Sequence, residues 1–422
     1  MIEELTRRVQ FATEKKKKVC AVSNMIGGYS LKRAISEFGL LAVVSTIWFL
    51  ILFVRQAFPP LFATFQADFS ISNTEVGFLF SVLMGTYAVT QFPSGVLSDR
   101  FGNLPIISLG TFLLSVGAVG FSVSPTFTLL AVAASVIGIG SGMHKTVAIN
   151  LLSEEYAQHR GFALGLMDTV GQFGGVAAPL VVVALQTSTL PWSLLFVATA
   201  IVGSSLSFTI HGGYVSRSRP PPDEEHDAGL ESPTKASYRQ LLFDSRLLLF
   251  VIAASLLAFA WNALSAFLPL YLTHAKDLTP ETASLIYSLF FGASLTQIVT
   301  GRLSDNVAYS TLMLGLVVVV LGGIAILVVG TGGIVIAIAV GVVGVGFHGL
   351  RPVRDSYFTV LLPDTIGGGG LGIIRTIMTV VGSIAPALFG LLSDRVGFGV
   401  AMMALGGVLL SCFVVLCYQR TK

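Results

Sequence analysis

Gly95-Val96-Leu97-Ser98-Asp99 recurs 206 positions later as Gly301-Arg302-Leu303-Ser304-Asp305. Two further segments repeat at nearly the same distance. Gly142-Met143-His144 returns 204 positions later as Gly346-Phe347-His348. Gly165-Leu166-Met167-Asp168 returns 207 positions later as Gly372-Ile373-Ile374-Arg375. The near-constant shift predicts a duplicated unit of about 200 residues, and membrane proteins built in this way bind their substrate at the interface of the two copies.

The composition indicates a membrane protein. The chain is 54% hydrophobic and 11% charged, whereas charged residues make up about 25% of soluble domains. Its mean hydropathy is +0.83. The 45 glycines allow close approach of membrane helices, and the net charge of +3 predicts no nucleic-acid partner. The three cysteines match no metal or redox spacing: Cys20, Cys412 and Cys417.

Apolar runs of about 20 residues, the length that crosses a bilayer, predict twelve transmembrane helices. Polar or Gly- and Pro-rich breaks separate them. The expected fold is therefore an all-α integral membrane protein of twelve helices in two pseudo-symmetric halves of six. The predicted spans are residues 36–62, 74–97, 104–123, 126–152, 161–186, 190–211, 245–273, 281–300, 308–329, 332–355, 367–392 and 397–418.

Polar segments divide the chain into four predicted regions. Residues 1–33 form a polar extension, 34–211 the first half, 212–244 a flexible linker and 245–422 the second half. Basic residues gather at both termini, in the linker and after the even-numbered spans. The positive-inside rule then predicts that both termini are cytoplasmic in a multi-pass protein of the cell membrane. We expect a monomer.

The loop after the second span resembles a known family signature. Gly95-Val96-Leu97-Ser98-Asp99-Arg100-Phe101-Gly102 is similar to the cytoplasmic loop 2–3 motif of the major facilitator superfamily, although Asn103 and Leu104 stand where two basic residues are usual. The resemblance implies that this loop and its copy form a conformational switch, in which a carboxylate interacts with helix N-termini of the other half. The implied switch residues are Gly95, Asp99, Arg100, Gly102, Gly301 and Asp305. A third copy, Gly390 to Gly397, falls on the outer side.

Several ionisable residues lie inside predicted spans, where a charge costs about 2.5–3.5 kcal/mol on insertion scales. They are therefore expected to pair or to face a cavity. The resemblance implies that spans 1, 4, 7 and 10 line a central pathway with spans 2, 5, 8 and 11 beside it. The residues concerned are Arg55, His144, Lys145, Asp168, His348, Arg351 and Arg375.

These residues give the candidate site. Excess positive charge favours an anionic substrate, because arginine binds carboxylate or phosphate with a planar fork. The predicted substrate-binding residues are Arg55, Arg375, His144 and His348, and the predicted proton-coupling residues are Asp168 and Lys145. Alternatives remain at this point. One alternative is that Arg55 snorkels outward, and another is that Lys145 snorkels to the cytoplasmic edge or only neutralises Asp168. The two histidines are alternatively packing residues bonded to backbone carbonyls, and Asp168 and Arg375 alternatively have a purely structural role. Tyr87, Trp261 and Asn262 are either substrate contacts or packing residues.

The function predicted from these features is secondary active transport. Neither a metal site, a nucleotide-binding loop nor a nucleophile–base pair is recognisable, so we expect no enzymatic activity, cofactor or metal, and an ion gradient as the energy source. The expected activity is proton-coupled alternating-access transport of a small organic anion. One alternative is drug or metabolite efflux by proton antiport, and another, of a different class, is a non-transporting membrane sensor.

Overall fold

The computed structural model describes residues 31–215, 245–361 and 367–421, with only the backbone at 31–37, 359 and 367–373. Most of the predicted extension (1–33) and linker (212–244) lies outside the described residues. The chain separates into two compact units, Met1–Val44 and Ser45–Lys422. The packing described below is that of the second unit, so the predicted division into two halves joined by a linker stays a prediction.

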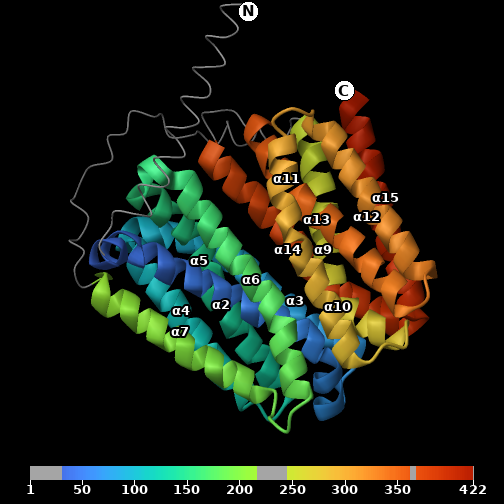
Figure 1. Ribbon diagram of the computed structural model, residues 1–422, viewed down its shortest axis with the longest axis horizontal. Coiled ribbons are helices and arrows are strands. Elements are labelled where there is room, and N and C mark those ends of the chain that lie inside the picture. Colours follow the sequence, from blue (N-terminus) through green and yellow to red (C-terminus); the bar gives the residue numbers. More distant parts are fainter. Residues whose placement is uncertain (1–30, 216–244, 362–366, 422) are drawn as a thin grey trace, which may run out of the picture. The chain divides into compact units, whose positions relative to one another are not determined.

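The described residues are helical and contain no strand (Figure 1). The first six spans are formed by α2 (Leu31–Phe69), α3 (Asn73–Phe101), α4 (Asn103–Ser122), α5 (Phe127–Glu155), α6 (Arg160–Gln186) and α7 (Ser193–Gly213). The others are formed by α9 (Ser245–His274), α10 (Pro280–Gly292) with α11 (Thr296–Leu303), α12 (Tyr309–Val329), α13 (Gly333–Leu361), α14 (Gly367–Val396) and α15 (Phe398–Thr421). A short 3-10 turn joins α10 to α11.

Within these residues, 12 helical segments are long and apolar enough to cross a membrane, which confirms the predicted number of spans. Their outward faces carry large apolar side chains such as Phe208, Val329 and Ile334, which are 69%, 78% and 79% exposed. Water would solvate such a surface poorly, whereas lipid tails accommodate it. The fold is therefore that of a multi-pass membrane protein, as the composition predicted.

Local sequence explains where the helices begin. Ser72 and Glu75 form a reciprocal capping box at the start of α3, and Thr126 and Thr279 cap α5 and α10. Gly102, between α3 and α4, has a φ of 86°, a value that glycine adopts without strain. Prolines inside several helices are tolerated because neighbouring spans can satisfy the freed backbone groups.

The most extensive contacts between the N-terminal helices (α2–α7) and the C-terminal helices (α9–α15) are those of α3 with α14 and of α6 with α10. The first contact is close, because a side chain at Gly77 would collide with the backbone at Pro386 and one at Gly390 with that of Asn73. These contacts lie at the start of α3 and the end of α14, which leaves the opposite ends of the two groups for the cavity described next.

A cationic cavity between the N-terminal and C-terminal helices

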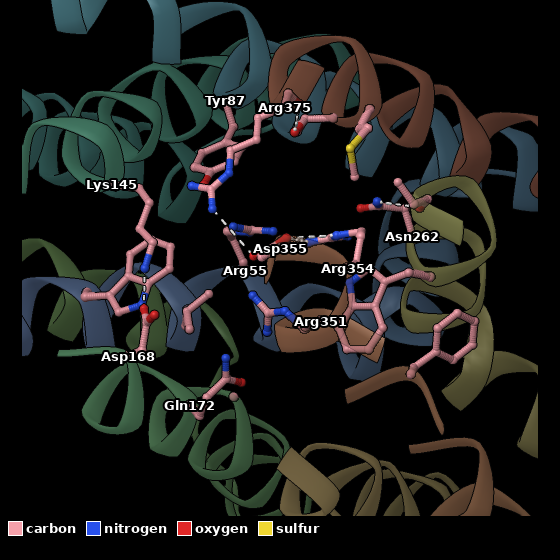
Figure 2. A pocket seen from close by; sticks show the side chains of 18 of the residues that line it. Arg55, Tyr87, Lys145, Asp168, Gln172, Asn262, Arg351, Arg354, Asp355 and Arg375 are labelled. Carbon is pink, nitrogen blue, oxygen red and sulfur yellow. Dashed lines mark hydrogen bonds and ion pairs between the residues drawn. The ribbon is translucent and has the colours of Figure 1, made fainter. Parts of the chain in front are cut away.

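A cavity of about 520 Å³ lies between the two groups of helices within Ser45–Lys422 (Figure 2). Its lining comes from α2, α3, α5 and α6 on one side and from α9, α10, α13 and α14 on the other. These are spans 1, 2, 4 and 5 and spans 7, 8, 10 and 11, the set that the resemblance implied. The volume lies within the range of small-molecule sites, about 300–1,000 Å³.

Basic residues dominate the charged part of the lining. Six basic side chains face the cavity, against two acidic ones, Asp168 and Asp355. The basic residues are Arg55, Lys145, Arg160, Arg351, Arg354 and Arg375. Because few acids are present to neutralise them, the cavity is a favourable place for a negatively charged solute.

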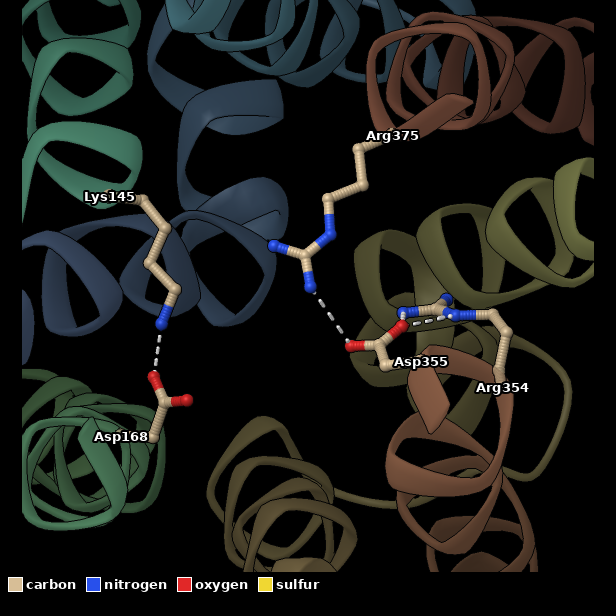
Figure 3. A network of polar contacts seen from close by, with 5 residues as sticks. All are labelled: Lys145, Asp168, Arg354, Asp355 and Arg375. Atoms are coloured by element: carbon tan, nitrogen blue, oxygen red, sulfur yellow. Dashed lines mark hydrogen bonds and ion pairs between the residues drawn. The ribbon is translucent and has the colours of Figure 1, made fainter. Parts of the chain in front are cut away.

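One ion pair lies within the N-terminal helices. Lys145 of α5 donates to Asp168 of α6 (Figure 3), and its ammonium lies 4.5 Å from the centre of the Trp48 ring. This is the neutralising contact that the sequence left as an alternative for Lys145. The Asp168 side chain is 55% exposed, so this carboxylate is both paired and accessible from the cavity.

Two further ion pairs, which share Asp355, lie within the C-terminal helices (Figure 3). Asp355 Oδ1 accepts from Arg354 Nε and Nη2 at 2.9 and 2.8 Å, and its Oδ2 lies 3.4 Å from Arg375 Nη2. Sequence reasoning missed Asp355 and treated Asp168 as the one acid securely within a span. The sequence did carry a signal for this cluster, because three charged residues stand close together within the predicted tenth span: Arg351, Arg354 and Asp355.

Arg55 and Arg351 differ from the other inward-facing arginines. Arg55 lies with its guanidinium carbon 4.6 Å from the centre of the Tyr87 ring, and its buried Nε has no hydrogen-bond partner. Among the described residues, neither Arg55 nor Arg351 forms an ion pair. Both point into the cavity (Figure 2), so Arg55 does not snorkel outward here. The sequence named Arg351 only as a residue within a span and assigned it no role.

The two repeated histidines do not line the cavity. His144 and His348 are fully buried. The His144 ring stacks on that of Trp48 with 5.9 Å between centroids, and the His348 ring lies edge-on to that of Trp261 at 5.1 Å. Both tryptophans do line the cavity, as do Tyr87 and Asn262. Each histidine therefore supports a tryptophan of the wall, and its predicted contact with substrate stays a prediction.

The predicted switch residues lie at exposed helix ends. Asp99 and Asp305 are exposed, and Asp99 forms no hydrogen bond or ion pair with another described residue. The Gly102 amide donates to the Ser98 carbonyl at 2.8 Å, and Arg100 lies 5.4 Å from the centre of the Phe101 ring. The carbonyl of Gly95 accepts a hydrogen bond from the Ser98 hydroxyl, and the carbonyl of Gly301 accepts one from the Ser304 hydroxyl. The switch role of these residues stays a prediction.

A match to a family profile gives the family of this chain. The sequence profile of the Major Facilitator Superfamily matches residues 44–290 and 250–422. The cis,cis-muconate transport protein of Acinetobacter baylyi is 21% identical over 83% of this chain and 86% of its own length. A probable 4-methylmuconolactone transporter of Cupriavidus pinatubonensis is 24% identical over 84% of this chain and 83% of its own.

Two further comparisons agree. An uncharacterized MFS-type transporter of Mycobacterium tuberculosis is 32% identical over 33% of this chain, although the match spans only 24% of that protein. The crystal structure of a D-xylose-proton symporter superposes with a TM-score of 0.74 at 15% identity, covering 90% of this chain and 97% of that one. The chain therefore belongs to the major facilitator superfamily and is a membrane transporter of small solutes.

Proposed function

We propose that this protein is a secondary active transporter that moves a small organic anion through the cavity by alternating access, driven by protons. The observation that carries the proposal is the pair of guanidinium groups, Arg55 and Arg351, that face the cavity without an acidic partner among the described residues. A buried charge is costly unless it is paired. A bound anion provides that missing partner.

The relatives support an anionic substrate. Muconate is a dicarboxylate, and a probable nitrate transporter of Staphylococcus haemolyticus is 24% identical over 37% of this chain. The six-to-two excess of basic over acidic lining residues opposes efflux of cationic drugs, which prefer an acidic cavity. Arg375, predicted to bind substrate, is held by Asp355 in this conformation, so we assign it a role after that contact breaks.

The proton pathway in this proposal is the Lys145–Asp168 pair. Asp168 is accessible enough to exchange a proton with the cavity, and protonation would release Lys145 to interact with the substrate. The alternating motion would be a rocking of the predicted halves, 34–211 against 245–422, around the site. The distribution of basic residues supports a cell-membrane protein with cytoplasmic termini, and hence a cavity that reaches the cytoplasmic ends of α5 and α13.

Transport by purified protein in liposomes tests the proposal. An inwardly directed or outwardly directed pH gradient should drive accumulation of a labelled organic carboxylate, while a cationic dye of similar size should not move. Arg160→Ala serves as a control. Arg160 is exposed at the edge of the cavity, so its side chain should contribute little to substrate binding and its loss should change transport little. A protein that transports cations but no anion under either gradient would contradict the proposal.

A further inference from the structure

The charges left after internal pairing define the substrate further. Asp168 is occupied by Lys145, and Asp355 is shared by Arg354 and Arg375. Three lining arginines form no ion pair with a described residue, and of these Arg160 is exposed at the edge of the cavity. The two that point into the cavity come from different groups of helices, Arg55 from α2 and Arg351 from α13. A ligand with one negative group would leave one of the two guanidinium groups without a partner. A ligand with two negative groups would satisfy both.

The rest of the wall is largely apolar. Two tryptophans, Trp48 and Trp261, face the cavity from the equivalent helices α2 and α9, each held by a buried histidine. Other apolar members of the lining are Leu52, Met84, Leu257, Phe291, Phe347 and Met378. Indole rings that cannot rotate freely favour flat ligands, which stack on them with little entropy loss. The walls suit an unsaturated or aromatic body better than a hydroxyl-rich sugar.

Taken with the proposed function, on which this step rests, these features lead us to propose that the substrate is a dianion with a flat, apolar body. One acid group is bound by Arg55 and the other by Arg351, and the body lies against Trp261 and the apolar lining, because the Trp48 ring is covered by His144 and Lys145. The arrangement bridges the two groups of helices through the ligand. A bridge of this kind makes substrate binding favour the approach of the two groups.

Matched pairs of ligands test the second charge. Thermal shift and titration calorimetry on the purified protein would compare three dicarboxylates of different body (muconate, adipate and terephthalate) with their monomethyl esters. Each ester keeps the body and loses one charge. A charge-assisted hydrogen bond supports an expected loss of roughly 10- to 100-fold in affinity, and muconate and terephthalate should bind more tightly than the flexible adipate.

Two variants test whether Arg351 binds the second carboxylate of the ligand. Arg351→Ala should bind each diacid and its ester with equal affinity, whereas Arg160→Ala should keep the difference. If diacids bind no better than their esters while monoanions bind well, the dianion inference fails and anion transport stands. If no carboxylate, mono- or dianionic, binds the folded protein, both the inference and the proposed function fail.

An independent observation concerns the segment Gly390 to Gly397 at the end of α14. Its residues Gly390-Leu391-Leu392-Ser393-Asp394-Arg395-Val396-Gly397 repeat the pattern of Gly95 to Gly102 at the end of α3. The geometry repeats too. The serine hydroxyl donates to the first glycine's carbonyl at 2.7 Å in the α3 segment and at 2.8 Å in the α14 segment. The last glycine has a φ of 86° and 85°, respectively.

The two acidic residues of these segments differ in their contacts. Asp394 reaches the start of α3, where its carboxylate accepts from the backbone amides of Asn73 and Thr74 at 3.2 and 2.8 Å and from the Thr74 hydroxyl at 2.6 Å. Asp99 forms no such contact with a described residue. A carboxylate at a helix N-terminus is stabilised by the free amides and the helix dipole. Asp394 therefore fastens its end of the α3–α14 pair in this conformation.

The Asp394 contact lies where α3 and α14 join the two groups of helices. The two helices pack together, and the end of α14 meets the start of α3. We infer that the contact of Asp394 with the start of α3 is a latch. Asp394 holds the end opposite the cavity mouth closed, and its release lets that end open.

Distance measurements between spin labels test the latch. Labels on Val123→Cys and Thr282→Cys, both exposed and at the Asp394 end of the two groups, would be placed in a chain lacking Cys20, Cys412 and Cys417. Asp394→Ala should add a longer distance and raise its population relative to the short one by roughly 2- to 30-fold, the range for loss of an N-terminal cap.

Two further variants make the result decisive. Arg395→Gln changes the neighbouring exposed residue and should leave the distances as in the unmodified chain. Thr74→Val removes only the hydroxyl bond and should give a smaller shift in the same direction, which keeps the test open if Asp394→Ala folds poorly. Identical distance distributions in Thr74→Val, Asp394→Ala and Arg395→Gln would overturn the latch.

Discussion

Replacing Asp355 by Asn should tighten anion binding while it weakens the fold. Asp355 accepts two bonds from Arg354 at 2.9 and 2.8 Å and approaches Arg375 at 3.4 Å. Asn keeps the shape but removes the negative charge, which leaves Arg354 and Arg375 facing each other without a carboxylate. The charged lining then changes from six basic and two acidic residues to six and one.

The magnitudes follow from the geometry. A buried charge-assisted bond contributes about 1.5–3 kcal/mol, but the Asp355 side chain is 39% exposed, so we expect a loss of only about 1–2 kcal/mol in the free energy of unfolding. An anion about 6 Å from the former carboxylate, at an effective dielectric constant of about 20–40, escapes about 1.4–2.8 kcal/mol of repulsion. Its affinity should rise about 10- to 100-fold.

Calorimetry on the purified protein and exchange of labelled anion between preloaded liposomes would measure both effects. The dissociation constant should fall, and the exchange rate should fall with it because release becomes slower. Glu155→Gln is the matched control, since it removes the same charge at an exposed position outside the cavity. A folded Asp355→Asn protein that binds anions as weakly as Glu155→Gln, or more weakly, would refute the reasoning.

Three other substitutions test the remaining parts of the site. Arg55→Lys keeps the charge but loses the planar fork, so anion affinity should drop about 10-fold in calorimetry; an unchanged dissociation constant would exclude a two-bond contact. Asp168→Asn should abolish accumulation driven by a pH gradient and spare exchange between preloaded liposomes, whereas continued accumulation would move the proton to another group. Gly390→Val should push α14 away from α3 and lower the melting temperature in detergent by several degrees, and unchanged melting would mean that this contact is loose.

The fold was accessible from sequence because its signals are long and repeated. Twelve apolar runs, each near the thickness of a bilayer, can hardly form anything else, and the copied Gly-x-Leu-Ser-Asp segments fixed the comparison with a family. Helix ends were less predictable. The first span reaches Phe69 instead of residue 62, since polar residues such as Gln66 remain helical where they bond to a neighbour, here Asn73.

The site was only partly accessible, because charge partners depend on how helices pack. Placement within a span led to Arg55, Lys145 and Asp168, all of which line the cavity. Which acid neutralises which base could not be read from spacing where the partners lie on different helices. Arg375 stands at the position equivalent to Asp168 in the repeat, and its partner in the structure is Asp355 of the neighbouring helix. The histidines show the converse problem, because a repeated polar residue also arises when packing is duplicated.

The Lys145–Asp168 and Arg375–Asp355 pairs have opposite polarity, and this affects how a solute is oriented in the cavity. Each joins equivalent helices in its own group, α5 to α6 and α13 to α14, yet the base is on α5 in the first and on α14 in the second. Reversal of sign after duplication makes the two walls electrically distinct. A ligand with unlike ends then meets an unequal field, so the cavity favours one head-to-tail orientation of such a ligand over the reverse orientation.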